Sequence, residues 1–402
     1  FFSIKTLHTL AIGSKFHSIS ISSMAVAPEL IHVDQLTCDI FSMLENKFLF
    51  GPASHTGRVR ILSVDGGIST DGVFAAAALT RLEEFLRVKS GSSNSTLADY
   101  FDVAAGSGLG GILAALMFVR GKDNRPLFSA RNALEFVLKM KKSQSCGLLK
   151  RIVNTSHSRK KSRMLESIFG DLTLKDALKP LLIPCYDTSS RAPFLFSRAD
   201  GLEAEGYDFR ISDICAATSA DSSPVETTSS DGKTKITAVD SGSAMSNPTA
   251  AAITHVLNNK MEFPLCKGME DLLVLSIGNG GPSDGASDMV DQAVGMAFGG
   301  CPGNYVRIQA SEVADKAKKL DAWAAAEASL SERNVESVLF RGKKVSSSTN
   351  LQKLEAFAGD LVNEEERRRA CIVPFVVLKQ SCPNVSTSPR SSSSTTLSSS
   401  SC

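Results

Sequence analysis

The sequence lacks any long hydrophobic run, although 43% of its 402 residues are hydrophobic. No stretch of about 18 apolar residues occurs, so no membrane-spanning helix is predicted. Lysine and arginine together number 44, against 42 aspartates and glutamates, which leaves a formal net charge of +2. A balance this close to zero offers no global argument for binding nucleic acid. The hydrophobic content is ordinary for a globular protein that buries a full core.

Cysteine pairs at metal-binding spacing are also missing. Nine cysteines are dispersed along the chain without a C-x-x-C pair, so neither a disulfide framework nor a zinc site is predicted. We therefore expect reduced and mostly buried thiols in an intracellular protein, either cytoplasmic or peripherally attached to a membrane. Residues expected to have structural rather than chemical roles are Cys185, Cys215, His255, Trp323, Asp213 and Asp221.

The two ends of the chain are expected to lie outside the main domain, which we place at residues 58–380. Residues 1–23 carry two lysines and no acid, as organelle transit peptides do, and a plastid location would follow if they are one. The alternative is upstream sequence translated in frame, with Met24 as the true start. The rest of the N-terminal extension, 1–57, contains apolar residues at helical spacing over 33–48, which predicts a packing helix. Residues 381–402 are serine-rich and are expected to be disordered.

Short apolar runs alternate with longer helical patterns along the main domain. This alternation predicts an α/β fold with a mainly parallel sheet in a single domain. One helix start is well marked, because Asn247-Pro248 supplies a capping asparagine followed by proline at the first helical position. The expected strands are 59–64, 101–105, 181–186, 193–196, 236–239, 272–277 and 305–310. The expected helices are 73–88, 108–119, 130–142, 211–219, 247–258, 287–298, 311–329 and 350–369.

Three of the expected strands end in unusual turns. The first ends at Asp65-Gly66-Gly67, a later one ends at Asp240-Ser241-Gly242, and between them four glycines fall within Gly106–Gly111. Because parallel strands present functional residues at their carboxyl ends, we expect these turns to gather. Glycines let N–H groups converge on an oxyanion, and an aspartate at a strand end can act as a base or a metal ligand.

The middle turn has the frame of a nucleophile elbow, in which G-x-S-x-G places a nucleophile between a strand and a helix. Here the frame reads Gly106-Ser107-Gly108-Leu109-Gly110. Glycine has no side chain, so Gly108 cannot form an acyl-enzyme. The same residues also satisfy G-x-G-x-x-G, but a dinucleotide site needs an acid about 20 residues on, at the end of a second strand. Asp123 lies near that count but directly after a helix, which makes the nucleotide site the weaker alternative.

The order of the motifs resembles a known family. ILSVDGG, AGSGLGGILAAL, LKDALKPLLIPCYD, AVDSGSAMSNPTAAAITHVLNN and DLLVLSIGNG follow one another between Arg58 and Leu378. They are similar to plant patatin-like proteins, above all to the third group of patatin-related phospholipases, in which glycine typically stands at the nucleophile position. The resemblance implies a three-layer α/β/α fold with a motif-bearing core at 58–258. It also implies non-specific acyl hydrolysis of phospholipids and galactolipids by a Ser–Asp dyad, without a metal or cofactor.

The same resemblance implies roles for individual residues. Gly66 and Gly67 would belong to the oxyanion hole, Gly108 occupies the nucleophile position, and Asp240 occupies the position of the dyad base. The sequence departs from the family pattern after Asp240, where Ser-Gly replaces Gly-Gly or Gly-Ala. The oxyanion turn is also one residue longer, and it carries Asp71 where the family has a basic or small residue.

Three routes could replace the missing nucleophile. Ser107 is adjacent, although the residue before an elbow nucleophile usually points away from the substrate. Ser241 lies beside Asp240 and is a weaker candidate. In the third route Asp240 activates water over an intact oxyanion hole, and loss of a triad member elsewhere leaves roughly 10³–10⁴-fold catalysis over water. The sequence therefore predicts a weak lipid acyl hydrolase, and the alternative is a catalytically inactive lipid-binding or regulatory protein on the same fold.

Residues 139–163 contain nine lysines and arginines and no acid. A solvated surface is the commonest explanation for such a segment. Contact with anionic lipid headgroups is the sharper alternative, and nucleic acid is the weakest. We therefore expect membrane lipids, reached by peripheral contact, as the substrates, and we expect no nucleic-acid partner. The sequence indicates no particular protein partner.

Overall fold

The structure is a computed structural model that describes residues 57–66, 72–145, 154–220, 223–240, 245–278, 285–309, 321–338, 342–371 and 374–379. The predicted packing helix at 33–48 and the serine-rich tail lie outside these ranges. The strands are β1 (Val59–Val64), β2 (Val103–Gly106), β3 (Leu181–Asp187), β4 (Ala192–Ser197), β5 (Val225–Thr228), β6 (Lys235–Val239), β7 (Leu272–Ile277), β8 (Tyr305–Ile308), β9 (Arg333–Val338) and β10 (Gly342–Thr349).

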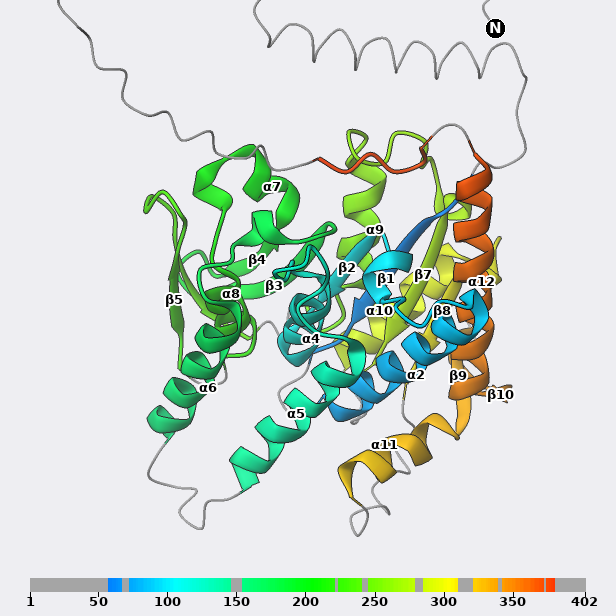
Figure 1. The fold of residues 1–402 in the computed structure, drawn as a ribbon, viewed down its shortest axis with the longest axis horizontal. Helices are drawn as coiled ribbons and strands as arrows, with labels where there is room; N and C mark the ends of the chain where they lie inside the picture. Colours follow the sequence, from blue (N-terminus) through cyan, green and yellow to red (C-terminus); the bar gives the residue numbers. More distant parts are fainter. Residues whose placement is uncertain are drawn as a thin grey trace, which may run out of the picture. The chain divides into compact units, whose positions relative to one another are not determined.

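Helices cover both faces of a central sheet (Figure 1). The helices are α2 (Val73–Ser90), α3 (Leu97–Tyr100), α4 (Gly108–Phe118), α5 (Ala130–Ser145), α6 (Asn154–Phe169), α7 (Arg198–Glu203), α8 (Ile211–Thr218), α9 (Thr249–Asn258), α10 (Gly285–Ala297), α11 (Ala322–Leu330) and α12 (Asn350–Ala370). Single 3₁₀ turns occur at Leu174–Asp176, Glu205–Tyr207, Met269–Asp271 and Pro302–Asn304. None of the helices within the described ranges combines the length and the apolar character that crossing a bilayer requires.

In the described part of the chain, eight strands form one sheet, and seven of them follow the order β5-β6-β3-β2-β1-β7-β8. The five strands from β3 to β8 in this order are parallel to one another. Strands β4, β5 and β6 join antiparallel at one end. The predicted mainly parallel sheet is therefore confirmed, with an antiparallel extension that the sequence did not indicate.

Alternate side chains of the central strands enter two separate cores. In β1, Leu62 and Val64 face a core that includes residues of α2, α4, α5, α8 and α12. Val59 and Ile61 face a second core that includes residues of α9 and α10. Strands buried on both faces are near-continuous apolar runs, and all six residues of β1 are buried. The arrangement confirms the predicted three-layer α/β/α fold.

Several elements differ from the prediction. Helix α9 begins at Thr249, one residue after the predicted first helical position Pro248, although Asn247 Oδ1 still accepts the Thr249 N–H at 3.0 Å. Helix α11 begins at Ala322 with Asp321 outside it, so the predicted helix at 311–329 starts later, while 310–320 lie outside the described residues. The sequence did not predict the hairpin formed by β9 and β10, the edge strand β5 or the basic helix α6, because these segments are short or mostly polar.

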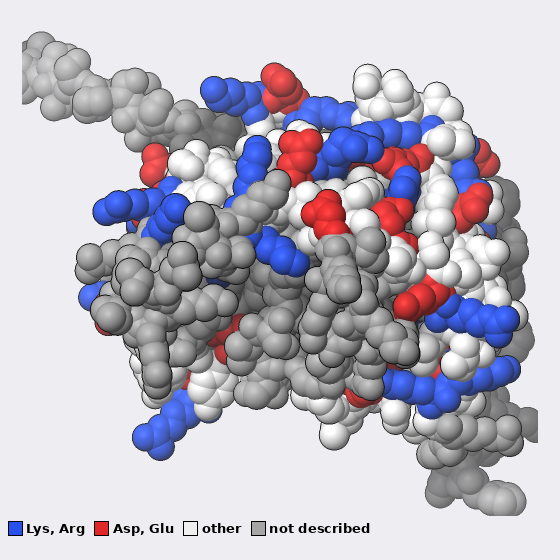
Figure 2. Space-filling view, turned by 90° about the horizontal axis from the view of Figure 1, so that it is seen from below, with Lys and Arg blue, Asp and Glu red and all other residues white. Residues whose placement is uncertain are grey.

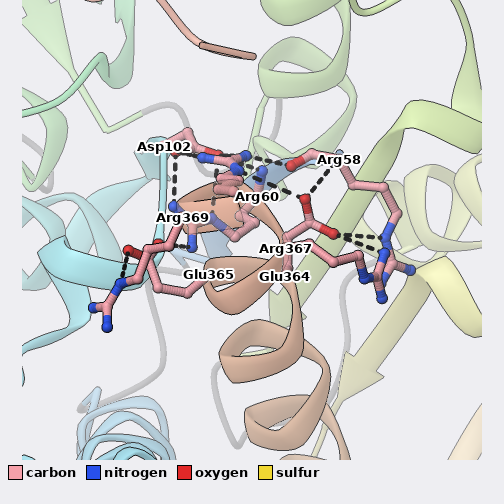
Figure 3. Close-up of polar contacts among 8 residues, drawn as sticks. Arg58, Arg60, Asp102, Glu364, Glu365, Arg367 and Arg369 are labelled. Carbon is pink, nitrogen blue, oxygen red and sulfur yellow. Dashed lines mark hydrogen bonds and ion pairs between the residues drawn. The ribbon is translucent and has the colours of Figure 1, made fainter. Parts of the chain in front are cut away.

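Charged side chains fasten α12 to the edge of the sheet where the parallel strands begin, which we call the amino edge. Arg60 of β1 binds the carboxylate of Asp102 (Figure 3). Arg368 of α12 donates to both oxygens of the same carboxylate, at 2.7 Å each. Glu364 accepts the Arg58 N–H at 2.7 Å, and Glu365 accepts from Arg60 at 2.8 Å. Burial alone would raise the pKa of Asp102, but the two guanidinium groups hold it below its usual range. We call these residues the amino-edge cluster.

Candidate active site

The turn after β2 has the backbone shape of an elbow. Ser107 is extended, Gly108 has a left-handed φ of 55°, and α4 begins at once. The Ser107 N–H donates to the carbonyl oxygen of Val64 at 3.1 Å, which ties the turn to the end of β1. A left-handed φ favours glycine, because other residues lose about 1–2 kcal/mol there. Any residue with a side chain at the nucleophile position would therefore be strained in the backbone conformation of Gly108.

The turns after β1 and β2 pack backbone against backbone. A Cβ atom added to Gly66 would lie 2.5 Å from the carbonyl oxygen of Ser107. One added to Gly110 would lie 2.4 Å from that of Val64, and one added to Gly106 would lie 2.3 Å from that of Gly110. Real Cβ atoms do not approach backbone so closely. These glycines therefore meet a steric requirement for bringing the first two predicted turns together.

Asp240 reaches the elbow along an edge of β3 that two strands share. All of β3 from Leu182 to Asp187 pairs with β4 on one edge. On the other edge β2 pairs with Leu181 and Leu182, and β6 pairs with Tyr186 and Asp187. The strands β2 and β6 therefore approach each other head-on along β3. Extending both registers brings Ser107 level with Pro184 and Asp240 level with Cys185.

Hydrogen bonds through the end of α8 connect the same two turns. The Gly108 N–H donates to Thr218 Oγ1 at 3.0 Å, and the Thr218 hydroxyl donates to the Pro184 carbonyl oxygen at 2.6 Å. Two residues further on, the Ala220 carbonyl oxygen accepts the Asp240 N–H at 2.8 Å. Asp240 is half-buried. The elbow and the predicted base are thus held by one short segment, although β6 runs against the parallel strands.

Two other residues of the predicted site, Ser107 and Gly66, are less accessible to substrate. Ser107 is fully buried, so substrate reaches its hydroxyl only if the turn opens. The Gly66 N–H already donates to the Ser246 carbonyl oxygen at 2.9 Å. Gly67 and Ser241 lie outside the described residues. In this structure, the predicted oxyanion hole therefore has no unoccupied N–H group from Gly66.

The start of α4 offers a donor that was missed at the sequence level. Among the described residues, Leu109 and Gly110 donate their N–H groups to no acceptor, whereas the Gly111 N–H donates to the Ser107 carbonyl oxygen. Leu109 is also half-exposed. The residue after an elbow nucleophile commonly contributes its N–H to the oxyanion hole, and the helix dipole adds positive potential there. Leu109 could have been predicted as a donor from the sequence on the basis of this general property of nucleophile elbows.

Asp65 is held by a buried arginine rather than presented as a base. Arg307 of β8 donates to both carboxylate oxygens of Asp65, at 3.0 and 2.5 Å, and the Ser287 hydroxyl donates at 2.8 Å. Burial raises the pKa of Asp65 while Arg307 opposes that rise. Arg307 also donates to Ser276 Oγ at 2.7 Å. An arginine inside an otherwise apolar strand was the sequence signal for this partner.

The residues predicted to be structural occupy such positions wherever the structure describes them. His255 is half-buried in α9 with its ring at an angle to that of Phe263, and Trp323 lies under the guanidinium of Arg81 at 5.8 Å. The thiols of Cys185 and Cys215 are buried, and burial raises the pKa of Cys185 to about 12. Asp213 is partly exposed and forms an ion pair with Arg210, while Asp221 lies outside the described residues. Asp123, which a dinucleotide site would need at a strand end, is exposed in a turn, so that alternative is wrong.

The basic segment 139–163 continues from the end of α5 into α6. Within its described part, Lys161 Nζ donates to the Ser219 carbonyl oxygen at 2.8 Å, so α6 lies beside the segment that leads to Ala220. Figure 2 views the molecule from below, and the described residues of that face carry blue and red side chains interspersed. Mixed signs of this kind are a poor footprint for nucleic acid. A solvated surface remains the simplest description of the described residues on this face.

Comparison with known proteins agrees with the fold. Residues 62–253 match the family model described as patatin-like phospholipase. The chain is 45% identical to patatin-like protein 7 of Arabidopsis thaliana over 87% of this chain and 85% of that protein. It is 48% identical to patatin-like protein 3 of Oryza sativa subsp. indica over 84% and 92% of the two chains. It is also 40% identical to the probable inactive patatin-like protein 9 of Arabidopsis thaliana, over 82% and 93%.

The fold and the turn together define the class of protein: an α/β/α protein with a nucleophile elbow between β2 and α4. The extent of these similarities then identifies the chain as a member of the patatin-like phospholipase family. The resemblance seen in the sequence motifs is confirmed.

Proposed function

We propose that the chain is a slow, non-specific lipid acyl hydrolase that cleaves phospholipids and galactolipids with water as the nucleophile. The observation that carries the proposal is the shared edge of β3, along which Ser107, the residue before Gly108, and Asp240 come to neighbouring levels. Membership of the patatin-like phospholipase family supports the reaction class. The missing side chain at Gly108 supports the low rate, because a covalent acyl-enzyme needs a side-chain nucleophile.

In the proposed mechanism Asp240 acts as a general base. As a water oxygen bonds to the ester carbonyl carbon, Asp240 accepts one water proton, and the carbonyl electron pair moves onto its oxygen. When the tetrahedral intermediate collapses, the bond to the alcohol oxygen breaks and that oxygen takes the proton from Asp240. The products are a free fatty acid and a lysolipid. A carboxylate with a water within reach is sufficient for this role.

The developing oxyanion would be stabilised at the start of α4. The Leu109 N–H has no acceptor among the described residues and belongs to the residue after the nucleophile position. Gly67 would add a second donor, as the family resemblance implies. Preorganised donors of this kind contribute about 3–4 kcal/mol each to stabilisation of the transition state, which is the main source of rate left to this site.

A second candidate function is lipid binding without catalysis. It is favoured by the absence of a side chain at Gly108 and by the buried hydroxyl of Ser107. A relative that is 40% identical is named a probable inactive patatin-like protein. In this alternative the elbow still accommodates an acyl ester, but no group attacks it. Peripheral contact with membrane lipids belongs to both candidates.

The test compares wild type with Asp240→Ala and Gly108→Ser on dispersed phospholipid and galactolipid, by release of free fatty acid. We expect Asp240→Ala to abolish a slow wild-type release, and Gly108→Ser to raise it by several orders of magnitude. Asp213→Ala removes a partly exposed carboxylate at the start of α8 and should leave the rate unchanged.

Two results would decide against catalysis. Equal release by wild type and Asp240→Ala would exclude Asp240 as the base. An unchanged rate in Gly108→Ser, with lipid binding preserved, would favour the second candidate. Thermal unfolding of Gly108→Ser checks that it folds, since serine at this φ loses about 1–2 kcal/mol.

A further inference from the structure

A cleft opens at the amino edge of the sheet, away from the elbow. It has a volume of about 530 Å³ and is lined by parts of α2, α3, α12, the turn after α4 and the segment before β3. The six-residue strand β1 spans roughly 20 Å, so the cleft is separated from the glycine turns by about the length of that strand. A volume of this size lies within the range of small-molecule sites, about 300–1,000 Å³.

The charged side chains that line the cleft are balanced in number. The cations are Arg125, Lys179 and Arg369, and the anions are Asp99, Glu365 and Glu366. Most of them are already paired. Arg125 lies 3.7 Å from Asp99, and Arg369 donates to Glu365 at 3.3 Å. Glu365 also accepts from Arg60 of the amino-edge cluster. The pairing leaves one cation and one anion.

Lys179 is the cation that is left. It is half-buried, and within the described chain its ammonium makes no hydrogen bond or ion pair. Asp102 is the carboxylate with the strongest electrostatic influence on Lys179. Both oxygens of Asp102, however, already accept hydrogen bonds from Arg60 and Arg368. Burial lowers the pKa of Lys179, Asp102 raises it, and the two arginines lower it again. An ammonium removed from water without a partner costs free energy, and such residues in clefts are candidates for ligand contacts.

The backbone holds Lys179 in place from both sides. The preceding residue, Leu178, donates its N–H to the Phe118 carbonyl oxygen at 2.8 Å. The following residue, Pro180, accepts the Ala104 N–H at 3.0 Å. Lys179 is therefore anchored to the start of β2 and to the end of α4, rather than carried on a mobile loop. A fixed backbone reduces the entropy lost when a ligand binds.

Glu366 is the anion that is left, and it lines the cleft from α12. Among the described residues its carboxylate has no ion-pair or hydrogen-bond partner. Neutral donors and acceptors lie beside the charged groups: Ser90 and Ser95 are 3.3 Å apart, and Ser95 is 3.4 Å from the Tyr100 hydroxyl. The lining therefore offers one open cation, one open anion and several hydroxyl groups. It matches a polar ligand better than an acyl chain.

We propose that this cleft binds a small zwitterion, with an oxyanion of the ligand at Lys179 and an ammonium group at Glu366. A phosphate and an ammonium on a short chain have this chemistry, whether the molecule is free or forms the headgroup of a lipid. A single cation would leave the half-buried Lys179 without a partner, whereas Glu366 is exposed and adds attraction for an ammonium group. Binding here is independent of any ester cleavage at the elbow.

Calorimetric titration of the full chain tests the proposal with phosphoethanolamine and with its two halves, inorganic phosphate and ethanolamine. We expect phosphoethanolamine to bind at least tenfold more tightly than either half. Lys179→Met, which keeps the methylene chain, should weaken its binding at least tenfold, and Glu366→Gln several-fold. The matched controls are Lys89→Met and Glu355→Gln, which break an ion pair between the same two helices, α2 and α12, outside the cleft. Both controls should bind phosphoethanolamine like wild type.

Vesicles distinguish the two sources of the ligand. Cosedimentation with phosphatidylethanolamine vesicles that is lost in Lys179→Met identifies a lipid headgroup, and binding of free phosphoethanolamine alone identifies a free metabolite. Either result supports the zwitterion site. Equal affinities for phosphate and phosphoethanolamine, unaffected by Glu366→Gln, would overturn it in favour of an anion site. No heat of binding up to about 10 mM, or equal binding by wild type and Lys179→Met, would overturn it altogether. These variants leave Asp240 and the elbow intact, so ester hydrolysis can fail or succeed separately.

Discussion

The two ends of β1 and β2 are stabilised in opposite ways. At their carboxyl ends, glycines let backbone meet backbone, and an added Cβ atom at Gly110 would lie 2.4 Å from a carbonyl oxygen. At their amino ends, long side chains fill the space, and Asp102 takes hydrogen bonds from two arginines. One end therefore tolerates no added atoms, and the other tolerates no removed charge. The candidate active site lies at the carboxyl end, where glycines provide no side chains. Its contacts are therefore mostly between backbone atoms, and few of them can be predicted from residue types alone.

Gly110→Ala should have the largest effect. The new methyl group would overlap the carbonyl oxygens of Val64 and Asp65, at 2.4 and 2.7 Å, and backbone cannot move aside as a flexible side chain can. We expect a loss exceeding about 4 kcal/mol in the free energy of unfolding, a size reserved for exceptional single substitutions. Soluble yield and urea unfolding monitored by circular dichroism would measure it. Cooperative unfolding within about 1 kcal/mol of wild type would show that the two turns separate easily.

Asp102→Asn addresses the opposite end. The substitution removes the buried carboxylate charge that Arg60 and Arg368 share and leaves them only Glu365 and Glu364 as partners, which should lower the free energy of unfolding by about 3–5 kcal/mol. Because the pKa of Asp102 is lower in the folded state than in the unfolded state, its contribution is fully present above the unfolded value and is lost as the pH falls through the folded one.

Urea unfolding between about pH 7 and pH 2 would measure this dependence. Wild type should lose stability below about pH 4, and Asp102→Asn should lack that part of the loss. Glu355→Gln, which neutralises an exposed carboxylate on α12, is the control and should follow wild type. Parallel acid profiles for wild type and Asp102→Asn would contradict the assigned role.

Thr218→Val should have an intermediate effect at the carboxyl end. It removes the acceptor of the Gly108 N–H and the donor to the Pro184 carbonyl oxygen, both in a buried region. Leaving buried polar groups without partners costs about 1–3 kcal/mol. Thr218→Ser keeps the hydroxyl and is the matched variant. Equal unfolding midpoints for the two variants would show that the hydroxyl does not hold the elbow.

Gly359→Ala should have the smallest effect and the opposite sign. Gly359 lies inside α12, and a Cβ atom added to it would have no neighbour within 4 Å. Alanine in a helix interior is favoured over glycine by about 0.5–1 kcal/mol. Gly91→Ala is the contrast, because its surroundings are equally empty but its φ is +65°. We expect the urea midpoint to rise for the first and to fall for the second. A fall for both would indicate hidden contacts on α12.

The sequence predicted what depends on local pattern. The apolar run of β1 and the glycines after it identify a buried strand and a tight turn without further information. The approach of Asp240 could not be predicted in this way, because β6 is antiparallel and meets β2 along β3 only through pairings between distant segments. The occupied N–H of Gly66 depends equally on a distant carbonyl oxygen, that of Ser246. The hairpin of β9 and β10 was missed because its residues are mostly polar.

The amino-edge cluster also sets an order on folding. Its hydrogen bond from Arg58 to Glu364 joins residues 306 positions apart. At synthesis rates of about 5–20 residues per second, α12 leaves the ribosome roughly 15–60 s after β1. During that interval Arg60 and Asp102 have each other but lack Arg368. Completion of the sheet edge is thus a late event, and chains that end before α12 should depend on chaperones or be degraded.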